Sequence, residues 1–305
     1  MQAIKLDEFL NYHFLSNVKL SPSANKAAFV VSKSNEEKDG YTSGIWTVDL
    51  NTKECRMLTA GKDESSFLWL NDDTLLFTSR RDRTKPEEVD QYYTDCFVIS
   101  LHGGEARKRM TIDAPARVVA SIDADTYLLD NFFTMSREER QKLLASRKEE
   151  KDYEVFSELP FWRNGAGITN LQRSRLYLYH AVEKVMEPLT EAKYQLEGYD
   201  LSQDKKKLVY CGSDFQGVES LKQELVEIDL ATKEKTVLVP LATWNIHHVV
   251  YAGEKIVVTA TENKKYGINE NANLYCYDRE NKKLQLISQP DRSYYSSVGS
   301  DCRYG

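Results

Sequence analysis

The sequence predicts an all-β chain, a β-propeller built from four-stranded blades. A strand–turn–strand phrase recurs along the chain, and a second phrase of the same kind precedes each copy. The copies also keep a spacing close to 50 residues in three of four intervals. Because internal repeats of this length are typical of propellers, the repeat decides the fold class before any chemistry is considered.

The main phrase is an alternating strand, a polar turn of about four residues and a second strand, which is the pattern of a β-hairpin. Its first copy runs through Ile45–Leu50, the turn at 51–54 and Cys55–Thr59. The first strands of the five copies end at Asp49, Ser100, His180, Asp229 and Asp278. The spacings are 51, 80, 49 and 49 residues, so the third unit carries an insertion of about 30 residues.

The second phrase is again a strand, an Asp/Asn/Gly-containing turn and a strand, as in Val18–Lys26 followed by Ala28–Val31. Two hairpins in each unit give four strands, the composition of a propeller blade. A non-repetitive β-sandwich with coincidental hairpins is the alternative. It gives no reason for a period near 50, so the propeller is favoured.

These phrases set the expected organisation. Residues 1–16 form a leader and residues 17–305 the propeller. The blades are expected at about 17–60, 64–112, 115–191, 195–240 and 244–288, and a sixth begins at about 291–305. The insertion in the third blade predicts a helix at about 136–151, since Ser136 and Glu139 form a capping box. Its narrow apolar stripe indicates a solvated helix, either a lid or a decorative insertion.

Composition excludes several classes of partner. The chain has 41 Lys plus Arg against 47 Asp plus Glu, so the net charge of −6 lacks the basic footprint of a nucleic-acid-binding protein. No apolar run reaches the ~20 residues that a membrane helix needs. The first eight residues carry Asp7 and Glu8 where a signal peptide is basic and then apolar, so we expect neither membrane association nor export, and a cytoplasmic location.

The sequence offers no catalytic or cofactor-binding constellation. The five cysteines are scattered without a C-x-x-C pair, so no metal site is expected and they are interpreted as reduced core thiols. Gly40 and Gly44 are the only glycines spaced as in G-x-S-x-G, and Thr42 stands between them instead of serine. Phosphate-loop, dinucleotide-binding and H-E-x-x-H motifs are also missing. We therefore assign no catalytic residue and no cofactor.

Phe161, Trp162 and Arg163 are the candidate recognition residues. They follow Pro160 in an irregular stretch just beyond the expected helix, and loops on a rigid scaffold often carry recognition. Trp and Arg are also typical contact residues. We expect the three near a domain interface or a channel mouth. The alternative is that the two aromatic rings fill the space between blades.

Several segments resemble one family. "LSPSANKAAFVVS" (20–32) and "FLWLNDDTLLFTSRRD" (67–82) resemble blade hairpins of the prolyl oligopeptidase family and of TolB-type propellers. "ELPFWRNGAG" (158–167), before "RLYLY" (175–179), and "SVGSDCRYG" (297–305) are similar to the acylaminoacyl-peptidase branch. The resemblance runs over essentially the whole chain.

The resemblance implies a serine peptidase in which a seven-bladed propeller caps an α/β-hydrolase domain holding Ser, Asp and His. The triad-bearing part follows the propeller, so no triad residue falls in this chain. The implied partners are short peptides, whose access the propeller limits, and the hydrolase domain of the same protein. The alternative is a free-standing TolB-like propeller that binds a protein or another ligand.

The resemblance also bears on the two ends. In this family the opening segment, here Lys5–Leu15, often packs as a helix on the hydrolase domain, and Leu6, Phe9, Leu10 and Phe14 have helical spacing. A simple leader to the first blade fits equally well. Five blades of seven would leave two apolar blade faces open. We expect self-association or a further segment to cover them, rather than closure into a five-bladed ring.

Overall fold

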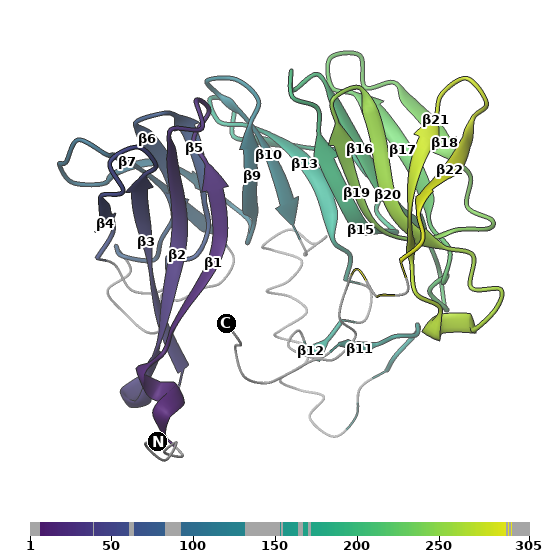
Figure 1. Ribbon diagram of the computed structural model, residues 1–305, viewed down its shortest axis with the longest axis horizontal. Coiled ribbons are helices and arrows are strands. Elements are labelled where there is room, and N and C mark those ends of the chain that lie inside the picture. The colour runs from purple at the N-terminus through teal and green to yellow at the C-terminus, as the bar shows by residue number, and fades with distance from the viewer. Residues whose placement is uncertain are drawn as a thin grey trace. The chain divides into compact units, whose positions relative to one another are not determined.

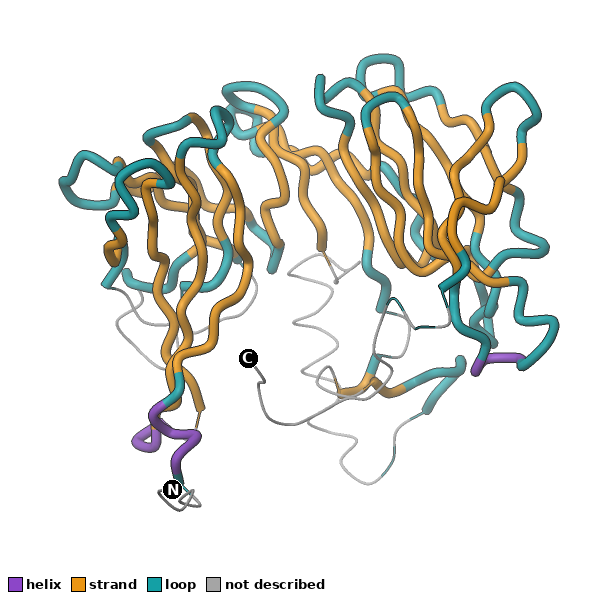
Figure 2. The backbone as a smooth tube through the Cα atoms, in the orientation of Figure 1, coloured by secondary structure: helices purple, strands orange, loops and turns teal. Residues whose placement is uncertain are grey.

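The computed structural model describes residues 7–38, 40–60, 64–82, 93–131, 153, 155–163, 167–169, 172–290, 292 and 294. Its regular structure is almost entirely antiparallel β-sheet, as Figure 2 shows. The described residues contain only short 3₁₀ helices, namely η1 (Glu8–Asn11), η2 (Glu36–Lys38) and η4 (Gly267–Asn269).

Five four-stranded sheets follow one another along the chain (Figure 1). Sheet 1 comprises β1 (His13–Leu20), β2 (Lys26–Asn35), β3 (Gly40–Asp49) and β4 (Cys55–Met57). Sheet 2 comprises β5 (Phe67–Asn71), β6 (Thr74–Thr78), β7 (Thr94–Ser100) and β8 (Arg107–Ile112). Sheet 3 comprises β9 (Arg117–Ser121), β10 (Thr126–Asn131), β13 (Arg175–His180) and β14 (Val185–Pro188).

Sheet 4 comprises β15 (Tyr194–Leu201), β16 (Lys207–Asp214), β17 (Glu224–Asp229) and β18 (Lys235–Val239). Sheet 5 comprises β19 (Asn245–Ala252), β20 (Lys255–Thr261), β21 (Asn273–Asp278) and β22 (Lys283–Ser288). Within each sheet the strands are neighbours in chain order, and a separate pair, β11 (Trp162–Arg163) and β12 (Gly167–Ile168), lies between β10 and β13 in the sequence. These meandering sheets are propeller blades, so the predicted fold class is confirmed.

The chain divides into two compact units. Unit 1 contains Met1–Leu129, Tyr179–Val185 and Ser300–Gly305, and unit 2 contains Asp130–Leu178 and Met186–Gly299. Sheets 1 and 2 belong to unit 1, and sheets 4 and 5 belong to unit 2.

The core of unit 1 forms between sheets 1 and 2. Because side chains alternate between the faces of a strand, Ala28, Val30 and Ile45 of sheet 1 share one face. They are buried in one cluster with the apolar side chains of sheet 2, Phe67, Leu75, Phe77, Phe97 and Ile99. A fully buried side chain of this size stabilises the fold by about 1.5–3 kcal/mol, so this cluster contributes substantially to the stability of unit 1.

The opposite face of sheet 1 is also apolar. Register places Leu15 opposite Val31, and Phe29 opposite Trp46, which in turn lies opposite Met57. Leu15 is 65% exposed and Met57 is 53% exposed. This face therefore presents apolar side chains to solvent.

The core of unit 2 forms between sheets 4 and 5 in the same way. Ile256, Val258 and Ala260 alternate along β20 and are buried with Val209 and Leu225 of sheet 4. Trp244 and Tyr275 pack on the rim of this cluster, with ring centroids 4.8 Å apart in an edge-to-face arrangement.

Aspartates explain why the outer hairpins recur. The carboxylates of Asp49, Asp229 and Asp278 each accept hydrogen bonds from the backbone N–H groups two and three residues later, at 2.9–3.0 Å. The chain then turns through a left-handed residue, Lys53 (φ 64°), Lys233 (φ 64°) or Lys282 (φ 50°). A type I turn followed by a left-handed residue joins antiparallel strands with the correct twist.

The beginning of the chain differs from expectation. The helical spacing of Lys5–Leu15 does not give a helix over that range: within the described residues η1 ends at Asn11, and β1 begins at His13, inside the expected leader 1–16. Instead of continuing as a helix, the chain pairs with β2 from His13 onward, and His13 lies opposite Lys33. Phe14 is therefore a buried strand residue, edge-to-face with Tyr41 at 6.2 Å. The predicted helix at 136–151 and most of 291–305 lie outside the described residues.

Candidate functional site

Residues 155–163, called here the aromatic segment, lie outside the four-stranded sheets of unit 2. Backbone hydrogen bonds tie it to the loop that follows β16: Leu159 N donates to Gly217 O at 2.6 Å, and Glu219 N donates to Leu159 O at 2.9 Å. Further along, β11 pairs with β12, and Thr169 N donates to Phe161 O at 2.8 Å. Backbone partners therefore hold the segment even though it belongs to no blade.

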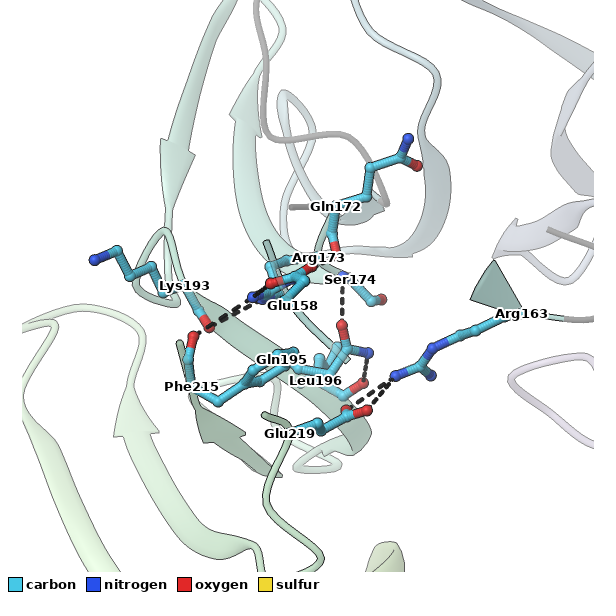
Figure 3. A network of polar contacts seen from close by, with 10 residues as sticks. All are labelled: Glu158, Arg163, Gln172, Arg173, Ser174, Lys193, Gln195, Leu196, Phe215 and Glu219. Carbon is cyan, nitrogen blue, oxygen red and sulfur yellow. Dashed lines mark hydrogen bonds and ion pairs between the residues drawn. The ribbon is translucent and has the colours of Figure 1, made fainter. Parts of the chain in front are cut away.

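A buried ion pair anchors the start of the segment (Figure 3). Arg173 Nη1 donates to Glu158 Oε1 at 2.9 Å, and Nη2 donates to Oε2 at 2.6 Å, a two-pronged geometry. Glu158 is 5% exposed and Arg173 is 4% exposed. The guanidinium also donates to the carbonyls of Lys193, Gln172 and Phe215, so the buried charge is well solvated by protein groups.

A second, more accessible ion pair lies at Arg163. Its Nη2 is 2.9 Å from Oε1 and 2.7 Å from Oε2 of Glu219, as the dashed lines in Figure 3 mark. Glu197, on β15, lies close enough to Glu219 and Arg163 for both charges to affect its pKa. Desolvation, and then the negative charge of Glu219, raise the pKa of Glu197 to about 7, while Arg163 opposes the shift.

Glu197 nevertheless keeps an exposed side chain. Exposure and desolvation are compatible for a carboxyl group that meets water on one side and protein on the others. Its charge therefore changes near neutral pH beside a fixed ion pair. Such perturbed carboxyl groups are more common at functional sites than elsewhere.

Large apolar side chains gather on the surface of this segment. The rings of Phe156 and Phe161 stack with centroids 4.2 Å apart, and Trp162 is 55% exposed. Further exposed apolar residues of the segment and the facing loop are Val155, Leu159, Val218 and Leu221. Exposed apolar patches often mark contact surfaces.

The three residues chosen from the sequence lie together at this site. Trp162 is 55% exposed, and Phe161, at 37% exposed, packs on Phe156. Arg163 is held by Glu219. Their role at an interface or channel mouth stays a prediction.

Sequence reasoning missed the charged residues that organise the site. Glu158 stands in the quoted motif, but Arg173, Glu197 and Glu219 come from separate segments with no shared spacing. An acid or an arginine between strands is usually a solvated surface charge, so nothing in the sequence singled them out.

The accessible side chains of the site are of kinds that often contact a partner. In the described part of the chain, no group of three or more His, Cys, Asp or Glu side chains is arranged to hold a metal ion. Among the helices there, none combines the length and the apolar character that crossing a membrane requires. Besides the buried Glu158–Arg173 pair, the site offers exposed aromatic rings, the Arg163 guanidinium and the carboxyl groups of Glu197 and Glu219.

Comparison with known proteins finds one related sequence and several structures with a similar fold. No family model matches the chain. The chain is 30% identical over 216 residues to the uncharacterized peptidase YuxL of Bacillus subtilis, a match that covers 69% of this chain and 31% of that protein. The chain thus spans about a third of that relative's length.

Solved structures share the fold. The acylaminoacyl peptidase of Pyrococcus horikoshii superposes with a TM-score of 0.62 at 15% identity, over 92% of this chain and 40% of that one. A structure from a study of two prolyl endopeptidases superposes with a TM-score of 0.58 at 13% identity, over 91% of this chain and 34% of that one.

The four-stranded sheets and these matches define the chain as a peptidase-related β-propeller. Its sequence relates it to part of the peptidase YuxL, and its fold matches part of the acylaminoacyl peptidase and part of the structure from the prolyl endopeptidase study.

Proposed function

We propose that the chain is the propeller of a serine peptidase and limits access of short peptides to an α/β-hydrolase domain of the same protein. The match to YuxL carries the proposal, because 69% of this chain aligns with about a third of a peptidase. The missing nucleophile motif agrees with a non-catalytic part.

The aromatic segment is the proposed contact with peptide or with the hydrolase domain. Exposed Trp and Arg side chains contribute most to many interfaces, and here Trp162 and Arg163 are adjacent on β11. The Glu219 contact and the backbone bonds of Leu159 hold Arg163 in place before any partner binds. Preorganisation of this kind reduces the entropy lost on binding.

The test uses the full-length protein that contains this chain and its hydrolase domain. Trp162→Ala is expected to lower kcat/KM for short peptide p-nitroanilides by about five- to thirtyfold, the effect of losing roughly 1–2 kcal/mol of contact. The melting temperature should change little, since Trp162 is exposed. Val185→Ala, an exposed residue of β14, is the control. Unchanged kinetics with lowered stability would contradict the contact role.

The 305-residue chain alone should hydrolyse none of these substrates. It should also remain unlabelled by a fluorophosphonate, the reagent that titrates activated serines. Turnover abolished by one equivalent of fluorophosphonate would overturn the non-catalytic assignment. A gene whose downstream sequence lacks G-x-S-x-G would instead favour a free-standing binding propeller.

A further inference from the structure

The repeat allows two neighbouring grooves of unit 2 to be compared position by position. In sheets 4 and 5 the outer hairpin begins with a capping aspartate, Asp229 or Asp278, and the left-handed lysine, Lys233 or Lys282, stands four residues later. Each hairpin lies beside the outer strand of the preceding sheet. Lys233 reaches β14, and β22 lies next to β18 (Figure 1).

The first groove is closed by ion pairs. Lys233 Nζ lies 3.2 Å from Glu187 Oε2, and Lys235 Nζ lies 3.1 Å from Glu191 Oε1. Both carboxylates belong to the outer strand of sheet 3 or to the residues just after it. In this first groove, Glu187 and Glu191 of the protein itself provide the carboxylates that pair with the two lysines.

The second groove lacks these acids. At the repeat positions of Glu187 and Glu191 the chain has Thr236 and Pro240. Within the part of the chain that the structure describes, no carboxylate lies within ion-pair distance of Lys282. The protein therefore leaves unfilled here the negative charge it supplies one blade earlier.

A cavity of about 190 Å³ occupies this second groove. Among the described residues its lining combines apolar side chains with two lysines and includes no acid; these residues are Leu238, Val239, Pro240, Thr243, Trp244, Lys282, Lys283 and Leu284. Val237, Leu241 and Leu286 are further exposed apolar residues of the neighbouring strands and loop. Apolar walls with a few charged groups are the usual composition of a binding site.

We propose that this groove binds an acidic peptide segment. A carboxylate of the peptide takes at Lys282 the place that Glu187 takes at Lys233, and an adjacent apolar side chain enters the cavity beside Trp244. Apolar burial provides most of the affinity, since exposed ion pairs contribute little. The lysines provide the preference for acidic over neutral sequences.

The experiment measures fluorescence anisotropy of a fluorescein-labelled Leu-Glu-Leu-Glu-Leu peptide with the 305-residue chain. The acidic peptide should bind more tightly than Leu-Gln-Leu-Gln-Leu, and added NaCl should remove the difference. Lys282→Gln should weaken binding by about two- to fivefold. The matched control is Lys233→Gln, which changes the same turn position where the lysine is already paired, and should leave binding unchanged.

A second variant adds a carboxylate of the protein itself to the proposed site. Thr236→Glu places a carboxylate where the preceding blade has Glu187, so it should satisfy Lys282 and reduce acidic-peptide binding to the level of the neutral peptide. Thr236→Gln should bind as the unchanged chain does. Thr236 is exposed on β18 but lies opposite Glu227, so circular dichroism of both variants checks that a second carboxylate there leaves the fold intact. Equal binding of both peptides, equal loss in Lys233→Gln, competition by inorganic phosphate as effective as by unlabelled peptide, or no binding at millimolar peptide would each overturn the proposal.

Discussion

The buried Glu158–Arg173 pair should be the most sensitive charged contact of unit 2. Glu158→Leu removes the carboxylate and leaves the Arg173 guanidinium, 4% exposed, with only the carbonyls of Lys193, Gln172 and Phe215. Breaking a buried pair from one side costs about 3–5 kcal/mol, because one charge stays without compensation. Because three carbonyl acceptors remain around the Arg173 guanidinium, we expect the loss in the free energy of unfolding to lie near the lower end of this range, at about 3 kcal/mol.

The double variant Glu158→Leu/Arg173→Met separates the charge from the packing. Removing both charges leaves no uncompensated group, and apolar replacement of a buried pair is often neutral or stabilising. The double variant should therefore recover most of the stability lost in Glu158→Leu. The control is Glu219→Leu, which breaks the more exposed pair with Arg163 and should cost no more than about 1 kcal/mol.

Urea unfolding followed by circular dichroism measures the free energy of unfolding of the four proteins. Amide hydrogen exchange adds a local readout, because loss of the anchor should expose the Leu159 and Glu219 N–H groups that now bond within the site. A double variant as unstable as Glu158→Leu would refute the charge argument. Equal costs for Glu158→Leu and Glu219→Leu would refute the role of burial.

The remaining predictions concern packing, pH and association. Gly212→Ala should lower the free energy of unfolding in urea by about 1–3 kcal/mol or more, because its Cβ would lie 2.2 Å from Gln195 O. In the control, Gly198→Ala on β15, the Cβ meets its nearest atom at 3.4 Å, so the free energy of unfolding should fall by less than about 1 kcal/mol. The raised pKa of Glu197 means that the folded chain binds this proton more tightly than the unfolded chain, so stability should fall as pH rises between about 4.5 and 7. Glu197→Gln should remove that part of the pH dependence, and an unchanged profile would contradict it. Leu15→Glu, on the exposed apolar face of sheet 1, should reduce any self-association seen by light scattering, while Lys205→Glu should not; a monomer at all concentrations would argue against association through this face.

The blades could be predicted because their determinants are local. Alternating apolar residues and an aspartate that accepts bonds from the next backbone N–H groups act over fewer than ten residues, as at Asp229. Only the end of β1, from Val18, was predicted as a strand. Its beginning was assigned to the leader because β1 buries only Phe14 of its eight residues, which leaves no apolar alternation to detect. Its pairing with β2 is decided by the neighbouring strand and not by its own pattern.

The candidate site was only half predictable. Aromatic residues and an arginine in an irregular stretch identified Phe161, Trp162 and Arg163, since composition alone marks them. Their partners could not be found in the same way, because Glu219 meets Arg163 through folding across 56 residues of sequence. Contacts of this range depend on how blades and loops are placed, which no local pattern encodes.

A repeat also limits where function can reside. Hairpins with the same capping aspartate and the same left-handed lysine offer a partner similar surfaces in sheets 1, 4 and 5, so these features alone cannot distinguish one of these positions from another. Discrimination must come from residues that break the repeat: Glu158 and Arg173 hold a segment that no other described blade carries, and Thr236 replaces the acid that occupies the preceding groove. Restoring the repeat with Thr236→Glu should therefore remove the preference for the acidic peptide, whereas separating Glu158 from Arg173 should lower the free energy of unfolding. If both changes acted through stability alone, departures from the repeat in this chain would be structural variation and not binding sites.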